Sequence, residues 1–361
     1  MGLNGWGLLM MSKEASPEGP EIKVVIYGVG EIGCRVARLL LKKRGIRIVG
    51  AIDRSPQKVG RDIAEVLGVE NPLGVTVSRD AAKVLSETKP DIVVHTTTSF
   101  LRDAYPQVLT AVEHGANVVS TTEELSYPYI ADPELAESLD RAAKLHGVTV
   151  LGTGINPGFL MDTLAITLTA VCQEVDKIKV KRVMNAATRR VPFQKKIGAG
   201  LTVDEFTEKI RTGVITGHVG LEQSIAMIAA ALGWNLDKVE VELVEPVVAT
   251  KHVESEVIKV EPGRVAGLRQ RAHGVMDGKK VITLDFQAYI GAEEEYDSVT
   301  IEGVPEVHER ISPCVHGDLG TVAVVVNMIP KVIEAPPGLK TMKDLPVPSA
   351  TPRDMRTHLS C

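Results

Sequence analysis

The sequence predicts an α/β protein in which a doubly wound parallel sheet is followed by a second, α+β domain with a largely antiparallel sheet. Three observations lead to this prediction. Short β-branched runs alternate with amphipathic stretches up to residue 154, as in a parallel sheet covered by helices on both faces. A G-x-G-x-x-G motif directly follows the first run. Beyond residue 155, long strands of alternating polarity take over, which is typical of an antiparallel sheet.

The first part of the chain supplies the elements of a Rossmann-type domain. Each expected strand is a short apolar run, and each expected helix carries apolar residues three and four positions apart. The strands are expected at 22–27, 46–53, 91–97, 116–121 and 148–154, and the helices at 31–45, 59–68, 99–114 and 133–146.

The second part mixes helices with longer strands. Helices are expected at 159–171, 202–212 and 219–232, strands at 177–186, 239–250 and 279–290, and a buried helix at 317–335. The tail after that helix is rich in proline and is predicted to be irregular. The predicted units are a disordered extension (1–20), a dinucleotide-binding domain (21–155), an α+β domain for substrate binding and oligomerisation (156–312), and a C-terminal helix with a tail returning to the first domain (313–361).

Composition and charge point to a small-molecule partner. The 361 residues are 44% apolar and 24% charged, with a net charge of −5, and no Lys/Arg run is long enough for a nucleic-acid patch. No apolar run approaches the roughly 20 residues that span a bilayer. The cysteines, spread from Cys34 to Cys361, form no metal-ligand cluster. We therefore expect a reduced, cytoplasmic protein without a bound metal.

The segment YGVGEIGCRVARLL predicts a dinucleotide site. Gly28 permits a tight turn, Gly30 lets the backbone approach a pyrophosphate, and Gly33 allows the helix to pack closely on the strand. Asp53 ends the second strand, where a carboxylate accepts the ribose hydroxyls of NAD. Arg54 is suited to a 2′-phosphate, which Asp53 repels, so NAD is favoured and NADP stays open. All six loop residues are predicted to touch the cofactor: Gly28, Val29, Gly30, Glu31, Ile32 and Gly33.

Three hydroxyl side chains follow the strand expected next in the sheet: Thr97, Thr98 and Ser99. This strand end faces the part of the crevice that receives the nicotinamide ribose. Two interpretations are compatible with each other. The hydroxyls bind the cofactor, or they cap the helix that is expected to start at Ser99.

Two adjacent carboxylates, Glu123 and Glu124, follow the buried strand that contains VVS (118–120). At the carboxyl end of a parallel strand they face the crevice in which open α/β sheets bind ligands. A partly buried carboxylate acts as an acid or base, or holds a substrate ammonium. It can equally offset the dipole in the first turn of a helix. Position alone does not decide between these roles.

Several segments outside the glycine motif resemble one enzyme family. The 2,4-diaminopentanoate dehydrogenases and their relatives, the native amine dehydrogenases, are similar in TTEELSYP, GTGINPGFLMD, RRVPFQKKIGAGLT, HGDLGTVAVVVNMIP and APPGLKTMKDLP. The resemblance implies NAD(P)-linked oxidative deamination of an amine to a ketone and ammonia, and reductive amination in reverse. In the relatives a glutamate at the end of this strand is the essential group near the reacting nitrogen. The resemblance favours Glu123 for that role, with Glu124 next.

A 2,4-diamino acid also needs an anchor for its carboxylate. Arg189 and Arg190 are candidates because Arg binds a carboxylate bidentately, although an Arg pair is also typical of a solvated face. Asn156 and Pro157 join the two domains and are expected to line the crevice. Asn156 is expected to hydrogen-bond the nicotinamide or the substrate, whereas Pro157 equally serves to shape the hinge.

Other functions and the oligomeric state stay open at this point. An amine dehydrogenase for simple amines without a carboxylate would share the family motifs, because pocket residues set the substrate. A non-catalytic NAD(P)-binding redox sensor would share the fold, but no DNA-binding or partner-binding element stands out. The half-open sheet of the second domain is expected to offer an apolar face for pairing across a two-fold axis, which favours a homodimer.

Overall fold

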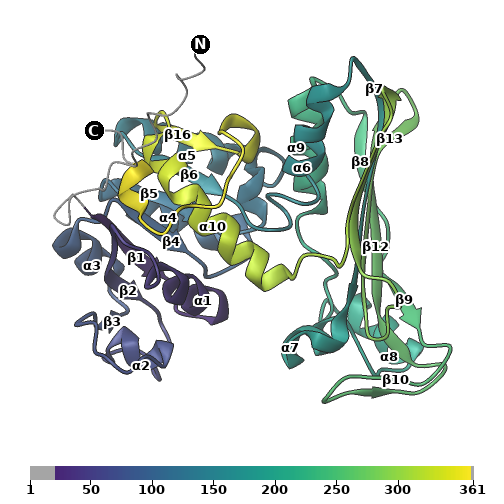
Figure 1. Cartoon of the computed structure of the whole chain (residues 1–361), viewed down its shortest axis with the longest axis horizontal. Coiled ribbons are helices and arrows are strands. Elements are labelled where there is room, and N and C mark those ends of the chain that lie inside the picture. Colours follow the sequence, from purple (N-terminus) through teal and green to yellow (C-terminus); the bar gives the residue numbers. More distant parts are fainter. Residues whose placement is uncertain (1–20, 359–361) are drawn as a thin grey trace, which may run out of the picture.

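The computed structural model describes residues 21–358, so the predicted extension 1–20 lies outside the described residues. The chain forms two lobes (Figure 1). The first contains a parallel sheet, and the second contains a mixed, mostly antiparallel sheet. The C-terminal segment, yellow in Figure 1, runs from the second lobe back to the first. The predicted fold class is confirmed.

Seven parallel strands form the first sheet, in the order β16-β6-β5-β4-β1-β2-β3. The chain moves outward from β1 to β3 and starts again at β4 on the other side of β1. The switch point therefore lies between β1 and β4, where open α/β sheets bind their ligands. The strands are β1 Ile22–Tyr27, β2 Ile46–Ile52, β3 Val77–Ser78, β4 Ile92–His95, β5 Asn117–Ser120, β6 Thr149–Gly152 and β16 Gly338–Lys340.

Helices cover both faces of this sheet because its strands are apolar on both sides. Val24 and Ile26 belong to one hydrophobic core and Val25 to the other, since successive side chains of a strand point to opposite faces. The first core is completed by α1 Glu31–Leu40, α2 Ile63–Leu67 and α10 Gly317–Glu334. The second is completed by α3 Ala81–Thr88, α4 Leu101–Glu113 and α5 Pro133–Leu145.

The proline-rich tail is not irregular throughout, which corrects the prediction. Residues 338–340 form β16, whose backbone pairs in parallel with β6 at the edge of the first sheet. An edge strand presents unpaired N–H and C=O groups to any extended segment that reaches it. The tail reaches it because α10 packs on α1 and β5 and delivers the chain there. No local pattern in the tail encodes this pairing.

The second sheet has the order β15-β14-β7-β13-β12-β8, and β9 also pairs with β12. Only β7 and β13 run parallel to each other. The expected strand 239–250 is divided into β8 and β9. The strands are β7 Glu174–Asn185, β8 Lys238–Val241, β9 Glu245–Val248, β12 Val265–Met276, β13 Lys279–Tyr289, β14 Tyr296–Val304 and β15 Val307–Ile311, and a separate ribbon pairs β10 Val253–Glu254 with β11 Lys259–Val260.

Helices of the same chain cover the apolar face of the second sheet. Leu268 and Ala272 of β12 are buried there with Ile225 and Ile228 of α9. The helices of this lobe are α6 Thr163–Leu168, α7 Val191–Lys196, α8 Val203–Arg211 and α9 Leu221–Leu232. The expected helices 202–212 and 219–232 match α8 and α9, and α8 begins at a capping box formed by Thr202 and Glu205. The short helix α7 was not predicted.

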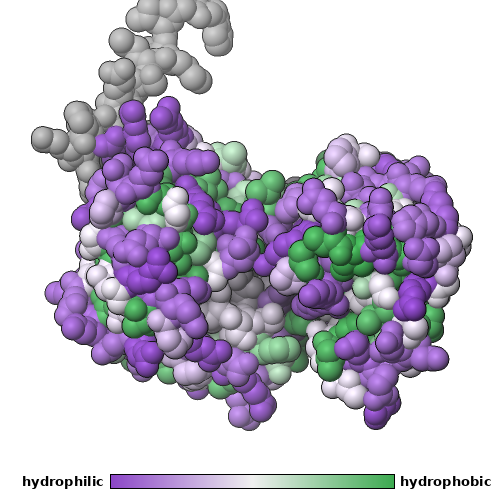
Figure 2. Space-filling model, turned by 90° about the horizontal axis from the view of Figure 1, so that it is seen from below, coloured by the Kyte–Doolittle hydropathy of each residue, from purple (hydrophilic) through white to green (hydrophobic). Residues whose placement is uncertain are grey.

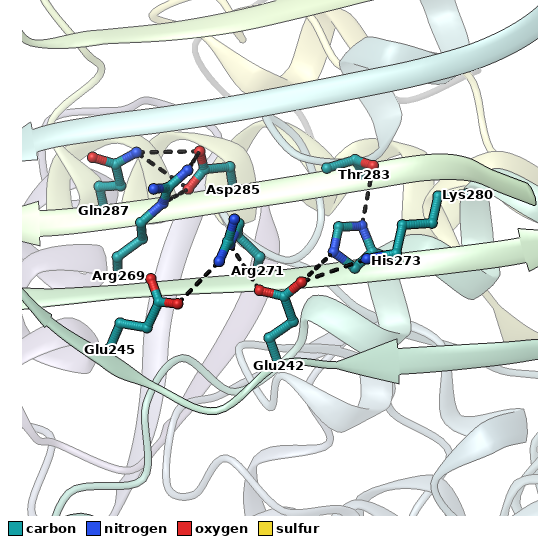
Figure 3. Close-up of polar contacts among 9 residues, drawn as sticks. All are labelled: Glu242, Glu245, Arg269, Arg271, His273, Lys280, Thr283, Asp285 and Gln287. Atoms are coloured by element: carbon teal, nitrogen blue, oxygen red, sulfur yellow. Dashed lines mark hydrogen bonds and ion pairs between the residues drawn. The ribbon is translucent and has the colours of Figure 1, made fainter. Parts of the chain in front are cut away.

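The other face of the second sheet is charged (Figure 3). Arg269 donates two hydrogen bonds to Asp285, at 2.9 and 2.8 Å, and Glu242 lies 2.8 Å from both Arg271 and His273. The expectation of a free apolar face on this sheet is therefore wrong, because the apolar side is covered within the chain. A homodimer does not follow from that argument.

Two features are absent from residues 21–358. No helix among them is long and apolar enough to cross a membrane. In the same range, no three His, Cys, Asp or Glu side chains are grouped so that they could hold a metal ion.

Candidate functional site

The three glycines of the loop after β1 occupy different environments. Gly28 has a φ of +99°, and a Cβ there would lie 2.8 Å from the Thr96 carbonyl oxygen. A Cβ on Gly33 would lie 1.9 Å from the Gly28 carbonyl oxygen, so only glycine lets α1 start against this turn. A Cβ on Gly30 would meet nothing within 4 Å. The open position is therefore Gly30, as expected for a glycine that a pyrophosphate approaches.

Asp53 follows β2 and binds the glycine loop. Its Oδ2 accepts from the Val29 N–H at 2.9 Å and from Lys58 Nζ at 3.0 Å, and its Oδ1 accepts from the Ser55 N–H at 2.8 Å. Burial favours a raised pKa for Asp53, but the hydrogen bonds from Ser55 and Lys58 outweigh it and lower the pKa. The carboxylate is ionised and already has three donors.

A cavity of about 670 Å³ opens beside this loop at the switch point of the sheet. It is lined by Gly28, Gly30, Asp53, Arg54, Arg79, Thr96, Thr97, Thr98 and Arg102, among others. The loop residues Glu31 and Ile32 begin α1, where Glu31 pairs with Arg35 and Ile32 packs against the first core. The open position at Gly30 and the N-terminus of α1 fit a dinucleotide pyrophosphate.

The hydroxyls after β4 have several partners. Thr97 Oγ1 lies 2.9 Å from both Gln107 Oε1 and His95 Nε2, and the Thr98 carbonyl accepts from Thr122. Ser99 does not cap α4, because the residue before the helix is Phe100, which provides no side-chain cap. The Ser99 hydroxyl instead hydrogen-bonds the Glu123 carboxyl group.

The two adjacent glutamates have different surroundings. Glu124 starts the 3-10 turn η1 (Glu124–Ser126), and its Oε2 accepts from the Leu101 N–H at 2.6 Å, at the start of α4. It therefore occupies one free N–H of that helix. Glu123 is half-buried and receives the Ser99 hydroxyl. Burial raises the pKa of Glu123, and its hydrogen bonds and the charge of Lys196 offset this only in part.

The raised pKa of Glu123 predicts a pH-dependent cost to stability. Between the ordinary value of 4.5 and the raised value, the folded state binds more protons than the unfolded state, so the free energy of unfolding falls as the pH rises. The cost grows with pH through this interval and is therefore larger at pH 7 than at pH 4. Glu123→Gln is expected to raise the melting temperature at pH 7 by roughly 1–2 °C, and to have no such effect at pH 4. Equal effects at both pH values in thermal unfolding would contradict this.

Asn156 lies in the segment that leaves β6 for the second lobe. Its Nδ2 is 2.8 Å from His218 Nε2, whereas its buried Oδ1 has no partner within the described chain. His218 stacks on Phe286 with ring centroids 4.4 Å apart. Burial lowers the pKa of His218 to about 3, helped by the charges of Lys196 and Arg182, so this ring is neutral. Pro157 is buried against Gly220 just before α9, which matches a packing role.

A buried aspartate joins this segment to α9. Asp162 accepts from the Gly158 N–H at 2.8 Å, the Thr163 N–H at 2.5 Å and the Ser224 hydroxyl at 2.7 Å. Burial raises the pKa of Asp162, and these donors oppose the shift. Because Ser224 belongs to α9, the carboxylate holds that helix against the segment that carries Asn156.

The arginine pair predicted to anchor a substrate shares one carboxylate. Arg189 Nη2 donates to Asp318 Oδ1 at 2.9 Å, and Arg190 Nε lies 3.7 Å from Asp318 Oδ2. Arg189 is buried, which lowers its pKa, and its Nε has no partner within residues 21–358. Asp318 belongs to the first turn of α10. The pair thus holds α7 near the start of α10.

Sequence reasoning missed three residues near this site: Lys196, His218 and Asp318. Lys196, at the end of α7, is exposed and has no ion-pair partner among the described residues, yet its charge acts on both Glu123 and His218. The RRVPFQKK run was the available signal for Lys196. Nothing local marks His218, because its partners Asn156 and Phe286 are far away in sequence.

A recess between the two lobes is visible in Figure 2.

Three features define an oxidoreductase with an NAD(P)-binding first domain. They are the glycine loop, the cavity beside it (the nucleotide cavity) and the carboxylate at the end of β5. Residues 22–146 match the N-terminus of dihydrodipicolinate reductase. Residues 159–361 match the 2,4-diaminopentanoate dehydrogenase C-terminal domain. The chain belongs to the 2,4-diaminopentanoate dehydrogenase family.

Individual relatives agree with this assignment. The chain is 40% identical over 347 residues to a 2,4-diaminopentanoate dehydrogenase of Acetoanaerobium sticklandii, covering 94% of this chain and 98% of that protein. An amine dehydrogenase structure from Mycobacterium smegmatis has a TM-score of 0.78 and 35% identity, covering 90% of this chain and 96% of that one. Dihydrodipicolinate reductase from Paenisporosarcina sp. TG-14 shares the fold alone, with a TM-score of 0.51 and 14% identity, covering 90% and 98%. Membership in a dehydrogenase family argues against the sensor interpretation.

Proposed function

We propose that this enzyme deaminates an amino-acid-derived amine oxidatively, giving a ketone and ammonia, with 2,4-diaminopentanoate as the substrate type and NAD or NADP as the hydride acceptor. The observation that carries the proposal is the half-buried Glu123 with its raised pKa at the end of β5. The identity to the Acetoanaerobium sticklandii enzyme supports the substrate type. The small-molecule partners are the amine, the ketone and ammonia.

The chemistry requires a base beside the substrate nitrogen. Hydride leaves the carbon as the nitrogen lone pair forms the C=N bond, so the ammonium must first lose a proton. Glu123 accepts that proton and then stabilises the positive iminium. Water adds to the iminium carbon, and Glu123 returns a proton to the nitrogen as ammonia leaves. When bound, the dinucleotide would be held at its pyrophosphate by the glycine loop, and it would accept the hydride.

Three buried oxygen atoms without a partner among the described residues fit a nitrogen ligand. Asn156 Oδ1, Gln223 Oε1 and Thr153 Oγ1 are buried without a hydrogen-bond partner within the described chain. Thr153 follows β6 and its N–H donates to Ser120 at the end of β5, and Gln223 lies in the first turn of α9, which contacts η1. Carboxamide oxygens only accept hydrogen bonds. They are suited to an ammonium, to ammonia or to the nicotinamide carboxamide.

We propose the cationic segment 189–196 as the anchor for the substrate carboxylate. Arg189 and Arg190 share Asp318, which leaves the segment with a net positive charge. Lys196 adds an exposed ammonium whose charge is felt at Glu123. An anchor on this side would hold a diamino acid between Lys196 and Glu123.

Replacing Lys196 tests the anchor and the substrate class together. Lys196→Gln is expected to lower kcat/KM for 2,4-diaminopentanoate about 10- to 100-fold, as for the loss of one charged hydrogen bond. It is expected to change kcat/KM for a primary amine on a secondary carbon, without a carboxylate, less than about threefold. Lys195→Gln is the matched control, because it removes a neighbouring charge of the same helix. Equal losses with both substrates would rule out the anchor.

A panel of amines distinguishes this proposal from the alternative of a simple amine dehydrogenase. Reduction of NAD or NADP would be followed by absorbance at alkaline pH, with 2,4-diaminopentanoate, ornithine, alanine and simple secondary-carbon amines. The diamino acid is expected to be turned over with the highest kcat/KM, and the simple amines only slowly. Turnover of simple amines instead would rule out segment 189–196 as a carboxylate anchor. The 35% identity to an amine dehydrogenase supports this alternative. The absence of any turnover would overturn the proposed function.

A further inference from the structure

We propose that the nucleotide pocket selects NADP(H) over NAD(H), with Arg54 and Arg79 holding the 2′-phosphate. The inference rests on the proposed function only in assuming that this pocket binds a nicotinamide dinucleotide. It reverses the preference for NAD that Asp53 suggested from the sequence. Three features of the pocket support it. The Asp53 carboxylate already accepts three hydrogen bonds, the pairing of β2 with β3 places two arginines at the same edge of the sheet, and the cavity lining carries an excess of positive charge.

Asp53 is poorly available to a ribose diol. Selection of NAD by an acid after β2 relies on its carboxylate accepting the ribose hydroxyls. A carboxylate offers about four lone-pair sites, and three donors already occupy this one, from Val29, Ser55 and Lys58. Its charge is also balanced by Lys58, whose Nζ lies 3.0 Å from Oδ2. The repulsion that Asp53 would exert on a 2′-phosphate is reduced for the same reason.

Two arginines emerge side by side at the carboxyl edge of the sheet. The parallel strands β2 and β3 place Ile52 opposite Ser78, and the Asp53 N–H donates to the Ser78 carbonyl at 3.0 Å. Arg54 and Arg79 follow directly and both line the cavity beside Gly28 and Gly30. Each is exposed and has no ion-pair or hydrogen-bond partner among the described residues. Their guanidinium groups are free to bind a ligand.

The charge of the lining favours an added phosphate. Three arginines line the cavity against two aspartates, Asp53 and Asp103. Arg102, the third, is paired with Asp132 at 3.1 Å, so the uncompensated positive charge lies with Arg54 and Arg79. A phosphate monoester carries a charge of about −1.5 to −2 near pH 7. Guanidinium groups bind such a group through two parallel hydrogen bonds.

Binding measurements without an amine substrate test the inference. NADPH and NADH would be titrated into the full-length protein by fluorescence, and 2′,5′-ADP and 5′-AMP would be compared as competitors. We expect NADPH to bind at least about tenfold more tightly than NADH, and 2′,5′-ADP to compete better than 5′-AMP. The Kd for NADPH should also rise more steeply with salt than the Kd for NADH, because the arginines are exposed.

The double variant Arg54→Ala/Arg79→Ala is expected to raise the Kd for NADPH at least about tenfold and the Kd for NADH less than about threefold. Arg61→Ala is the matched control. Arg61 is an exposed arginine of the same lobe that pairs with Glu65 and is absent from the cavity lining. Tighter or equal binding of NADH by the unmodified protein, or equal losses for both nucleotides in the double variant, would overturn the inference. A clear preference for NADPH in a protein that turns over no amine would refute the proposed function and leave this inference standing.

Discussion

Glu123→Gln is expected to lower kcat for amine oxidation by a factor of about 10²–10⁴, the usual contribution of a positioned acid or base. Glutamine keeps the size of the side chain and its carbonyl acceptor, so the Ser99 hydroxyl retains a partner. It cannot accept the proton of the substrate ammonium or offset the charge of the iminium. The Kd for NADPH, measured by fluorescence, should change little, because Glu123 is not among the residues that line the nucleotide cavity.

Glu124→Gln is the matched control, because it makes the same chemical change one residue away. The Glu124 carboxylate accepts from the Leu101 N–H, so the variant weakens the start of α4 and should lower the melting temperature. Most of the activity should remain. Loss of activity in Glu124→Gln with full activity in Glu123→Gln would exchange the two assignments. The acidic limb of the pH profile of kcat/KM, which we expect to follow the raised pKa of Glu123, gives an independent readout.

Gly33→Ala is expected to abolish nucleotide binding and to destabilise the protein. The new methyl group would lie 1.9 Å from the Gly28 carbonyl oxygen and 2.8 Å from Thr96 Oγ1, so α1 must move away from the turn. Overpacking of this kind typically costs about 1–3 kcal/mol, and the displaced helix loses its place beneath the pyrophosphate. Thermal unfolding and NADPH titration would measure the two effects.

Gly30→Ala is expected to weaken nucleotide binding without destabilising the fold. A methyl group at Gly30 meets no protein atom within 4 Å, so the melting temperature should stay within about 1–2 °C of the unmodified protein. The same methyl group occupies the space that a pyrophosphate approaches, so the affinity for NADPH should fall about tenfold or more. An unchanged affinity in Gly30→Ala would place the pyrophosphate elsewhere.

The parts of this protein that could be predicted from its sequence are those encoded by neighbours in the chain. The buried run IKVVIY, the glycine spacing after it and the periodicity of α1 all depend on residues within one or two turns of one another. The same is true of α8, whose start is marked by Thr202 and Glu205. The resemblance to one family in segments such as TTEELSYP added the chemistry and led to the glutamate pair.

The difference between Glu123 and Glu124 could not be predicted in this way. It arises because the Leu101 N–H at the start of α4 reaches one carboxylate, whereas Ser99 and the charge of Lys196 reach the other. Whether the open face of the second sheet is apolar was likewise decided by packing. Helices α6 and α9 cover its apolar side, and pairs such as Arg269 with Asp285 cover the other.

The sequence by itself determined the fold class, the glycine loop and the candidate acids, because strand burial, helix periodicity and glycine geometry are local properties of the chain. Only the tertiary structure decided the pairing of β16 with β6, the saturation of Asp53 by Lys58, and the neutral state of His218. Each of these depends on groups that are brought together by packing. Hydrogen bonding and desolvation act over a few ångströms in space, whatever the separation of the groups along the chain.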